Sequence, residues 1–440
     1  MKYIPHTPDE VASMLKTIGV EKVSDLFPKA LQQPETFDFP KPHSEIEIRK
    51  NILALASKNH VNMNSFLGGG AYAHYIPHIV DVLSSRSEFA TSYTPYQPEA
   101  SQGTLQSLFE FQTMMAHLTG LEISNASMYD GATACAEAIL MSLRLEKKRK
   151  KVLIAKNIHP RYIETALTYL QEQDIQIEMI PYHQKTGQLD LNTLSSNLND
   201  SPCSLLIQSP NYFGIMEPLE EISHSCKNNK TLLLTAVSDP TSLALFQPPG
   251  AYGADIVVGE AQSLGNPVSF GGPYVGFMTT KMEFVRQLPG RLVGESVDLN
   301  NKRAFTLTLS KREQHIRREK ATSNICTNQN LCALRTSIYL ATLGKQGLKE
   351  VSQQCYSKTE YAKEQFSQIK NVQLKFSGPT YHEFVYKTPL PSKEVLQKLE
   401  EKNIIGGIAI EEGILCCVTE LTTSSQIDHY ARELKRILNS

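Results

Sequence analysis

The chain has 440 residues, a net charge of −1 and 41% hydrophobic residues. Its length is too great for one small domain, and its composition predicts a large folded core rather than disorder. The balanced charge gives no indication of binding to nucleic acid or to a membrane surface. We expect no signal peptide, because residues 1–15 have no apolar run; no apolar stretch of about 18 residues occurs, and the eight cysteines form no CxxC pair. We therefore expect a cytoplasmic protein that spans no membrane and holds no metal.

The first 60 residues predict a helical arm with a linker. Thr7, Pro8 and Glu10 form a helix-start signal, with a capping side chain, a proline in the first turn and a glutamate three residues after the cap. Residues 32–42 are rich in proline and polar side chains and predict an extended linker. Helix is expected again over residues 44–56.

Three consecutive glycines, Gly68 to Gly70, come after this arm. A dinucleotide-binding loop would need a strand before the glycines and a helix after them in a compact βαβ unit, and that context is missing. We therefore expect a flexible turn near a cleft.

From about residue 103 the pattern alternates between helices and short apolar strands, which predicts a mostly parallel sheet covered on both faces. After two helical stretches, 331–343 and 348–369, a smaller alternating unit follows. We predict three parts: an arm and linker at 1–60, a large α/β domain at 61–330 and a small C-terminal α+β domain at 331–440. Strands are expected at 151–155, 177–180, 203–208, 231–237, 256–258, 274–279, 372–376, 383–386 and 414–418.

Three loops carry groups that suit ligand binding. The segment 93–99 is stiffened by two prolines and precedes a helix start at 101–103, while 128–133 places small residues at another helix start. The segment 312–329 combines basic side chains with a run of hydroxyl and amide groups, which is the chemistry of a clamp for phosphate or carboxylate. Each loop also has an interpretation without a ligand: a rigid surface loop at 93–99, a plain helix start at 128–133 and a solvated charged face at 312–329.

The order of elements suggests the layout of pyridoxal-phosphate enzymes of the aspartate aminotransferase type. Such a site needs a lysine for the cofactor aldehyde, a carboxylate for the pyridine nitrogen, a flat group against the ring and helix-start donors for the phosphate. His159 could stack on the ring, and the turn at 131–133 could hold phosphate. No lysine follows the strand 256–258, where Gln262 lies instead, and Lys281 should point elsewhere.

The sequence resembles subunit 1, the alpha chain, of the P-protein family of the glycine cleavage system, the glycine dehydrogenases (decarboxylating). Aligning Gly271-Gly272-Pro273 with the glycine-rich turn of the related beta chain puts Gln262 at the lysine position and Ala236 at the aspartate position. Asp239 is not an obvious substitute for that aspartate. The resemblance extends over essentially the whole chain and is carried by residues 3–7, 18–20, 66–68, 71–72, 74–77, 93–99, 101–103 and 312–327.

The resemblance implies a pyridoxal-phosphate-dependent decarboxylation of glycine, with transfer of the aminomethyl group to the lipoyl arm of the H-protein. The cofactor would be bound covalently by the beta chain, in an α2β2 heterotetramer. This chain would complete the partner's active site. The residues expected to be lent to that site are Tyr93, Tyr96, Glu99, Ser101, Gln102, Arg317, Lys320, Thr322, Ser323 and Asn324.

Two other functions are compatible with the sequence. The chain could be an independent pyridoxal-phosphate enzyme that uses an unexpected lysine, which a visible cofactor band in the single chain would support. It could also be a non-catalytic scaffold for the beta chain, in which case Tyr96→Phe and Arg317→Ala would leave turnover unchanged.

Overall fold

The computed structural model describes residues 5–28 and 39–439, and the chain divides into two compact units, Met1–Val61 and Asn62–Ser440. The predicted linker at 32–42 lies mostly outside the described residues. The predicted domain boundary at residue 330 stays a prediction. Among the described residues, no helix is both long and apolar enough to cross a membrane.

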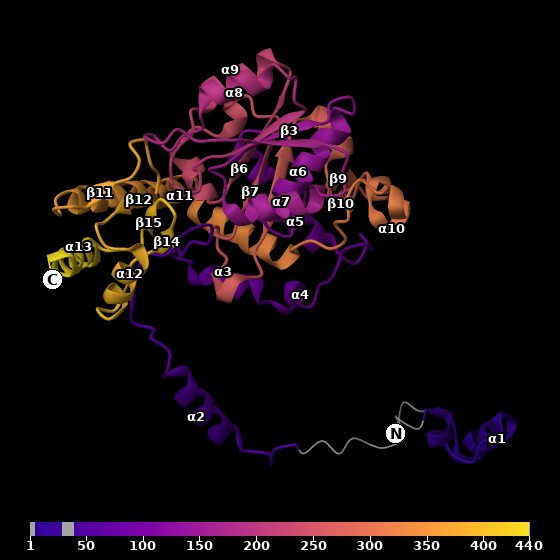
Figure 1. The fold of residues 1–440 in the computed structure, drawn as a ribbon. Helices are drawn as coiled ribbons and strands as arrows, with labels where there is room; N and C mark the ends of the chain where they lie inside the picture. The colour runs from indigo at the N-terminus through magenta and orange to yellow at the C-terminus, as the bar shows by residue number, and fades with distance from the viewer. Residues whose placement is uncertain (1–4, 29–38, 440) are drawn as a thin grey trace. The chain divides into compact units, whose positions relative to one another are not determined.

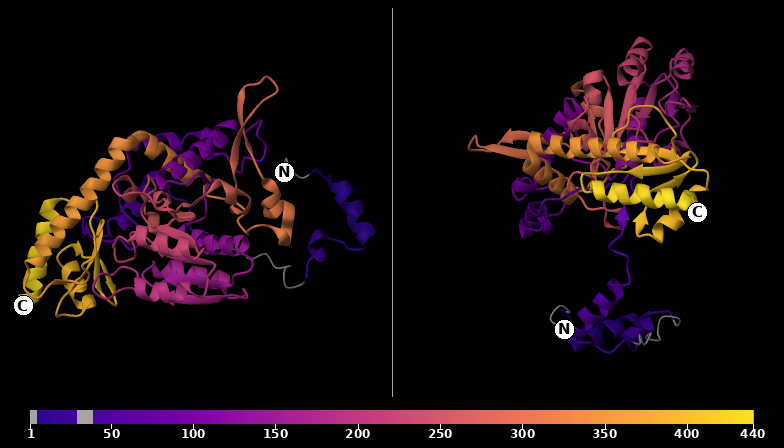
Figure 2. Two further views of the ribbon diagram at one scale, coloured as in Figure 1. Left: turned by 90° about the horizontal axis from the view of Figure 1, so that it is seen from above. Right: turned by 90° about the vertical axis from the view of Figure 1, so that its left-hand side faces the viewer.

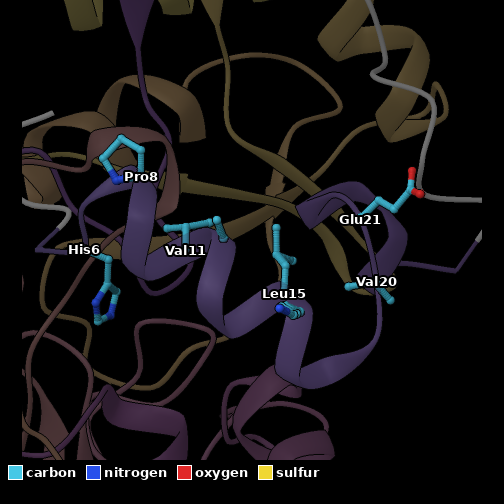
Figure 3. A pocket seen from close by; sticks show the side chains of 8 residues that line it. His6, Pro8, Val11, Leu15, Val20 and Glu21 are labelled. Atoms are coloured by element: carbon cyan, nitrogen blue, oxygen red, sulfur yellow. The ribbon is translucent and has the colours of Figure 1, made fainter.

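The first unit contains two helices, α1 (Pro8–Ile18) and α2 (Glu45–Ala56), and a short 3-10 helix, η1 (Val23–Leu26). The predicted start of α1 is confirmed, because the Thr7 hydroxyl accepts from the backbone N–H of Glu10 and the Glu10 carboxylate accepts from that of Thr7. Neither helix buries a residue within the described part of the chain. Val11 and Leu15 of α1 and the nearby Val20 line a shallow apolar pocket within this unit (Figure 3).

The second unit is built on a seven-stranded sheet with the order β2-β8-β7-β6-β5-β3-β4. The strands from β7 to β4 are parallel, and β8 is antiparallel to both of its neighbours. This confirms the prediction of a mostly parallel sheet. The strands are β2 (Ile123–Ser124), β3 (Lys151–Ala155), β4 (Gln176–Ile180), β5 (Ser204–Gln208), β6 (Leu232–Val237), β7 (Ile256–Glu260) and β8 (Gly276–Thr280).

Helices cover both faces of this sheet, as expected for strands that are continuously apolar. The helices α8 and α9 pack together, and α6 packs along α7 (Figure 1), whereas α5 packs against β2, β8 and α11. Leu153, Leu206, Leu234 and Val257, one from each of four adjacent strands, are fully buried in the core between them. The helices are α3 (His78–Ser84), α4 (Ser87–Ala90), α5 (Gln102–Thr119), α6 (Gly131–Leu145), α7 (Pro160–Leu170), α8 (Leu191–Leu198) and α9 (Leu219–Asn228).

A two-stranded hairpin, β9 (Val293–Val297) with β10 (Arg303–Leu307), projects from the second unit (Figure 2). This hairpin was not expected from the sequence. A short helix, α10 (Gln314–Arg317), follows it, flanked by the 3-10 turns η7 (Ser310–Arg312) and η8 (Arg318–Lys320).

The C-terminal part begins with α11 (Asn330–Ser367), a long helix interrupted at Gly344, which accounts for the two helical stretches predicted there. A four-stranded sheet of order β11-β12-β15-β14 follows, and β13 pairs with the short strand β1 near the start of the unit. The elements are β1 (Asn64–Ser65), β11 (Gln373–Leu374), β12 (Glu383–Lys387), α12 (Ser392–Glu400), β13 (Ile404–Ile405), β14 (Ile408–Ile410), β15 (Gly413–Cys417) and α13 (Ser424–Asn439).

Candidate functional site

The carboxyl ends of β3, β6 and β7 and the start of α6 carry the positions at which the expected cofactor would be held. Ala236 lies within β6, and Gln262 follows β7 by two residues. His159, after β3, is the capping residue of α7, and Gly131 is the first residue of α6. Because parallel strands end at one edge of a sheet, residues distant in sequence meet there.

Gln262 is bonded to a segment that lies 190 residues earlier in the chain. Its side-chain oxygen accepts from the backbone N–H of Tyr72 at 3.0 Å, and its amide nitrogen donates to the Tyr72 carbonyl at 3.0 Å and to the Asn266 carbonyl at 2.7 Å. The Gln262 residue is 2% exposed. All of its side-chain hydrogen-bonding groups therefore have partners within this chain.

His159, the predicted ring-stacking group, packs against the glycine-rich segment. Its Nδ1 accepts from the backbone N–H of Arg161, so its Nε2 carries the proton and donates to the Gly69 carbonyl at 2.7 Å. A Cβ atom on Gly70 would lie 2.7 Å from Cδ2 of His159, closer than real contacts. Burial lowers the pKa of His159, which favours the neutral ring.

A carboxylate occupies the helix start where a phosphate was considered. Glu260 Oε2 accepts from the backbone N–H of Gly131 at 3.0 Å, and Oε1 accepts from the N–H groups of Gln262 at 3.1 Å and Val275 at 2.9 Å. Burial raises the pKa of Glu260 to about 7. The Glu260 carboxylate therefore accepts the hydrogen bond from Gly131, the first backbone donor of α6, that a phosphate would otherwise accept.

The residues present do not fit covalently bound pyridoxal phosphate. Gln262 cannot react with its aldehyde, buried Ala236 cannot pair with its pyridine nitrogen, and the donor at Gly131 is engaged by Glu260. Lys281 lies at the opposite edge of the sheet, because β8 runs antiparallel, and it pairs with Asp255.

The three glycines, expected from the sequence to form a flexible turn near a cleft, are packed closely against neighbouring side chains. The segment is held on both sides: the backbone N–H of Gly69 donates to Glu383 Oε1 at 2.6 Å, and the Tyr72 hydroxyl donates to Glu383 Oε2 at 2.8 Å. A Cβ on Gly68 would lie 2.3 Å from Oε1 of Glu383. The glycines are therefore required by the close approach of backbone to neighbouring side chains.

A buried ionic cluster lies beside this segment. His74 Nε2 is 3.0 Å from Asp239 Oδ2, His74 Nδ1 is 2.7 Å from Glu420 Oε2, and His382 Nε2 is 2.8 Å from Asp239 Oδ2. Burial opposes the charged form of His74, but the charge of Asp239 outweighs it and raises the His74 pKa well above its usual value. Burial likewise opposes ionised Asp239, yet the charge of His74 and hydrogen bonds from both histidines hold its pKa well below the usual range.

The nitrogen and oxygen atoms of His74, Asp239 and His382 are of the types that bind metal ions, and they lie within 4.8 Å of one another. Both nitrogens of His74, however, already contact carboxylates directly. Each ring nitrogen of His74 is therefore taken up by a carboxylate and is not free to bind an ion. We therefore describe the cluster as an ion-pair network.

A second cluster brings two of the predicted loops together on the surface. The Tyr96 ring lies 5.4 Å from the His315 ring, edge to face, and 5.2 Å from the guanidinium carbon of the buried Arg291. Arg291 also donates to Asn328 Oδ1 at 3.0 Å and to the Cys326 carbonyl. The segments 93–99 and 312–329 are thus joined through Arg291, a residue that the sequence analysis did not single out.

Most of the residues expected to be lent to a partner are accessible. Tyr93, Glu99, Arg317, Lys320 and Asn324 are exposed, as is Tyr96, whereas Ser101, Thr322 and Ser323 are partly buried. Gln102 is different, because its side chain accepts from the Phe305 N–H at 2.8 Å and donates to the carbonyls of Phe305 and Pro98. Its amide is therefore used to attach the loop to β10.

The sequence matches the family described as glycine cleavage system P-protein over residues 1–434. A relative in Legionella pneumophila, named “Probable glycine dehydrogenase (decarboxylating) subunit 1”, is 46% identical over 100% of this chain and 99% of its own length. A relative of the same name in Carboxydothermus hydrogenoformans is 45% identical over 99% of each chain.

Among solved structures, the chain is similar to a crystal structure of glycine decarboxylase (P-protein) of the glycine cleavage system in inhibitor-bound form. The two are 39% identical, with a TM-score of 0.85 and full coverage of both chains. Sphingosine-1-phosphate lyase from Burkholderia pseudomallei K96243 is 13% identical, with a TM-score of 0.68 and 94% coverage of each chain, and shares the fold. These likenesses confirm the predicted fold class.

Proposed function

Because the chain belongs to the glycine cleavage system P-protein family, we propose that it is the subunit of a heteromeric glycine decarboxylase that does not carry the cofactor. In this proposal the partner subunit binds pyridoxal phosphate covalently and this chain completes the partner's active site. The name “subunit 1” of the relatives supports the existence of a partner subunit. An α2β2 assembly and a lipoylated H-protein as acceptor of the aminomethyl group belong to the same proposal.

The observation that carries the proposal is the set of hydrogen bonds among this chain's own groups at the position expected for the cofactor. Gln262 is paired with Tyr72, His159 with Gly69, and the helix start at Gly131 with Glu260. Each of these pairs engages a group that pyridoxal phosphate would otherwise contact, which supports the proposal that the partner subunit binds the cofactor. Bound by the partner, it would accept the electrons released when glycine loses its carboxyl group.

The residues proposed to reach the partner's site lie on the surface formed by segments 93–99 and 312–329. Tyr93 and Tyr96 would pack beside the cofactor and glycine and exclude water. Arg317 and Lys320 would attract a carboxylate or phosphate, where a charge-assisted hydrogen bond contributes about 1.5–3 kcal/mol. The exposure of these side chains supports this role, because a residue offered to a partner cannot be buried in its own chain.

The test is a reconstitution with separately purified chains. Exchange of the glycine carboxyl with labelled bicarbonate would be followed for this chain, for its partner and for the mixture, in each case with H-protein, together with the visible absorbance of the cofactor. We expect exchange only in the mixture and no cofactor absorbance from this chain alone. Exchange by this chain alone would favour an independent enzyme. In the active mixture, unchanged turnover with Tyr96→Phe and Arg317→Ala would favour a scaffold.

A further inference from the structure

Arg291 is among the largest fully buried side chains in the described part of the protein, with 2% of the residue exposed. Its donors converge on the two loops of the candidate surface. Nη2 donates to the Tyr96 hydroxyl at 3.0 Å and to the Cys326 carbonyl, and Nη1 donates to Asn328 Oδ1 at 3.0 Å.

The carboxylate of Glu313, which is the counter-charge of Arg291, does not form a close ion pair with it. Its Nε lies 3.9 Å from Glu313 Oε2, and neither this Nε nor Glu313 Oε1 has a hydrogen-bond partner among the described residues. Burying a guanidinium with one distant carboxylate is costly. An apolar residue could fill this space without that cost. The hydrogen bonds from the guanidinium to the two loops are therefore the reason for an arginine here.

The chemistry of the contact fixes the direction of the Tyr96 hydroxyl. A guanidinium has five donors and no acceptor, so the phenol oxygen must accept from Arg291. The phenol hydrogen is then directed away from Arg291. In the described residues the Tyr96 hydroxyl has no second hydrogen-bond partner, and the Tyr96 residue is 49% exposed. Tyr96 therefore presents an O–H donor at the surface of the chain.

We propose that Arg291 is a positioning residue that orients Tyr96 so that its phenol O–H donates to an anionic oxygen in the active site shared with the partner subunit. This inference rests on the function proposed above. The oxygen would belong either to the carboxylate of glycine or to the phosphate of the cofactor. Arg291 acts on it through Tyr96 and does not touch it.

The experiment uses the reconstituted two-subunit enzyme with Arg291→Lys, Tyr96→Phe and the double variant in this chain. Lysine keeps the buried charge but cannot reproduce the planar fork that reaches Tyr96, Cys326 and Asn328 together. We expect each single variant to lower kcat/KM by about tenfold and the double variant to fall no further, because both remove the same contact. An increase in KM for glycine would assign the oxygen to its carboxylate, and weaker binding of added pyridoxal phosphate would assign it to the phosphate.

Arg303→Lys is the matched control. Arg303 lies on the exposed hairpin, pairs with Glu295 and stacks over Phe305 at 5.0 Å, so its replacement should leave kcat/KM unchanged. Losses that multiply in the double variant would overturn the proposal, since Arg291 would then act independently of Tyr96. Wild-type activity in Tyr96→Phe would also overturn it, whether or not the Arg291 variant folds. If the wild-type mixture itself has no activity, the proposed function fails and this inference fails with it.

Discussion

The side-chain amide of Gln262 matches both backbone groups of Tyr72, accepting from one and donating to the other. Glutamine and asparagine are the two side chains with an amide oxygen acceptor and an amide NH2 donor side by side, and asparagine is one methylene shorter. A lysine at this position would have donors only, and it would leave the Tyr72 N–H without an acceptor in a buried site.

We therefore predict that Gln262→Lys alone does not create a cofactor site. After incubation with pyridoxal phosphate and removal of the excess, the variant should show no bound visible absorbance. Its free energy of unfolding should fall by about 1–3 kcal/mol because of the unsatisfied Tyr72 N–H. A stable visible band that disappears on treatment with a competing amine would show that the cleft is open and that only the lysine was missing.

The sequence identified Gln262 because it follows the strand 256–258, whose apolar run is easy to recognise, whereas Ala236, inside the strand 231–237, was identified through the resemblance. It did not identify Tyr72 as the partner of Gln262, since a contact across 190 residues leaves no local pattern. Arg291 was missed for a similar reason. A single arginine after Gly290 resembles a surface residue, and its burial depends on loops that fold against it from both directions in the chain.

Among the elements, the glycine-rich segment 68–72 lies against both Gln262 and His159. Gly70 has φ +104° and would place a Cβ 2.7 Å from the His159 ring, while Gly271 has the same φ of +104° with nothing within 4 Å of its Cβ position. Adding a side chain at each of the two positions therefore separates backbone strain, which both share, from the steric effect of the His159 ring, which acts at Gly70.

We predict that Gly271→Ala costs about 1–2 kcal/mol of unfolding free energy, as expected for an L-residue in a left-handed conformation. Gly70→Ala should cost about 2–3 kcal/mol more, because the methyl group must displace His159 from its hydrogen bond with the Gly69 carbonyl. Denaturant unfolding of both variants measures the difference. Equal losses at the two positions would mean that the segment is not packed tightly against His159.

Six of the seven strands of the central sheet were predicted within a few residues because their buried residues form continuous apolar runs, whereas the two-residue strand β2 was not predicted. The hairpin β9–β10 escaped prediction because it lies largely outside the core. Val297 is 61% exposed and Leu299 is fully exposed, so packing imposes little alternation on its sequence. The short strands β1 and β13, of two residues each, are defined only by their pairing across 340 residues.

At the scale of the whole second unit, the ion-pair network links residues from widely separated parts of the chain. Asp239 follows β6 of the large sheet, His74 follows the glycine-rich segment, and His382 and Glu420 flank β12 and β15 of the C-terminal sheet. The packing of the two sheets against each other therefore depends on the protonation states of His74, Asp239 and Glu420.

The direction of the pH dependence follows from the shifted pKa values. Asp239 and Glu420 have pKa values below their usual ranges; in both, burial opposes the shift, but the partner charges and hydrogen bonds outweigh it. Their stabilisation is present above the unfolded-state pKa of about 4 and is lost as pH falls through the lower folded-state values. The pKa of His74 is raised, so its stabilisation is complete below about pH 6.5 and is lost as pH rises from there through its folded-state pKa.

We predict that His74→Gln destabilises the protein most between about pH 5 and pH 6.5, where wild-type His74 is fully protonated and both carboxylates are ionised. The loss there should be about 3 kcal/mol, because two buried carboxylates are left without their cation. The difference from wild type should shrink as pH is raised above about 6.5, since the wild-type contribution declines there. His224→Gln, at an exposed position on α9, should differ little from wild type across the range. Guanidinium unfolding in steps from about pH 5 to pH 10 measures these differences, and a constant loss at every pH would show that His74 contributes by packing rather than by its charge.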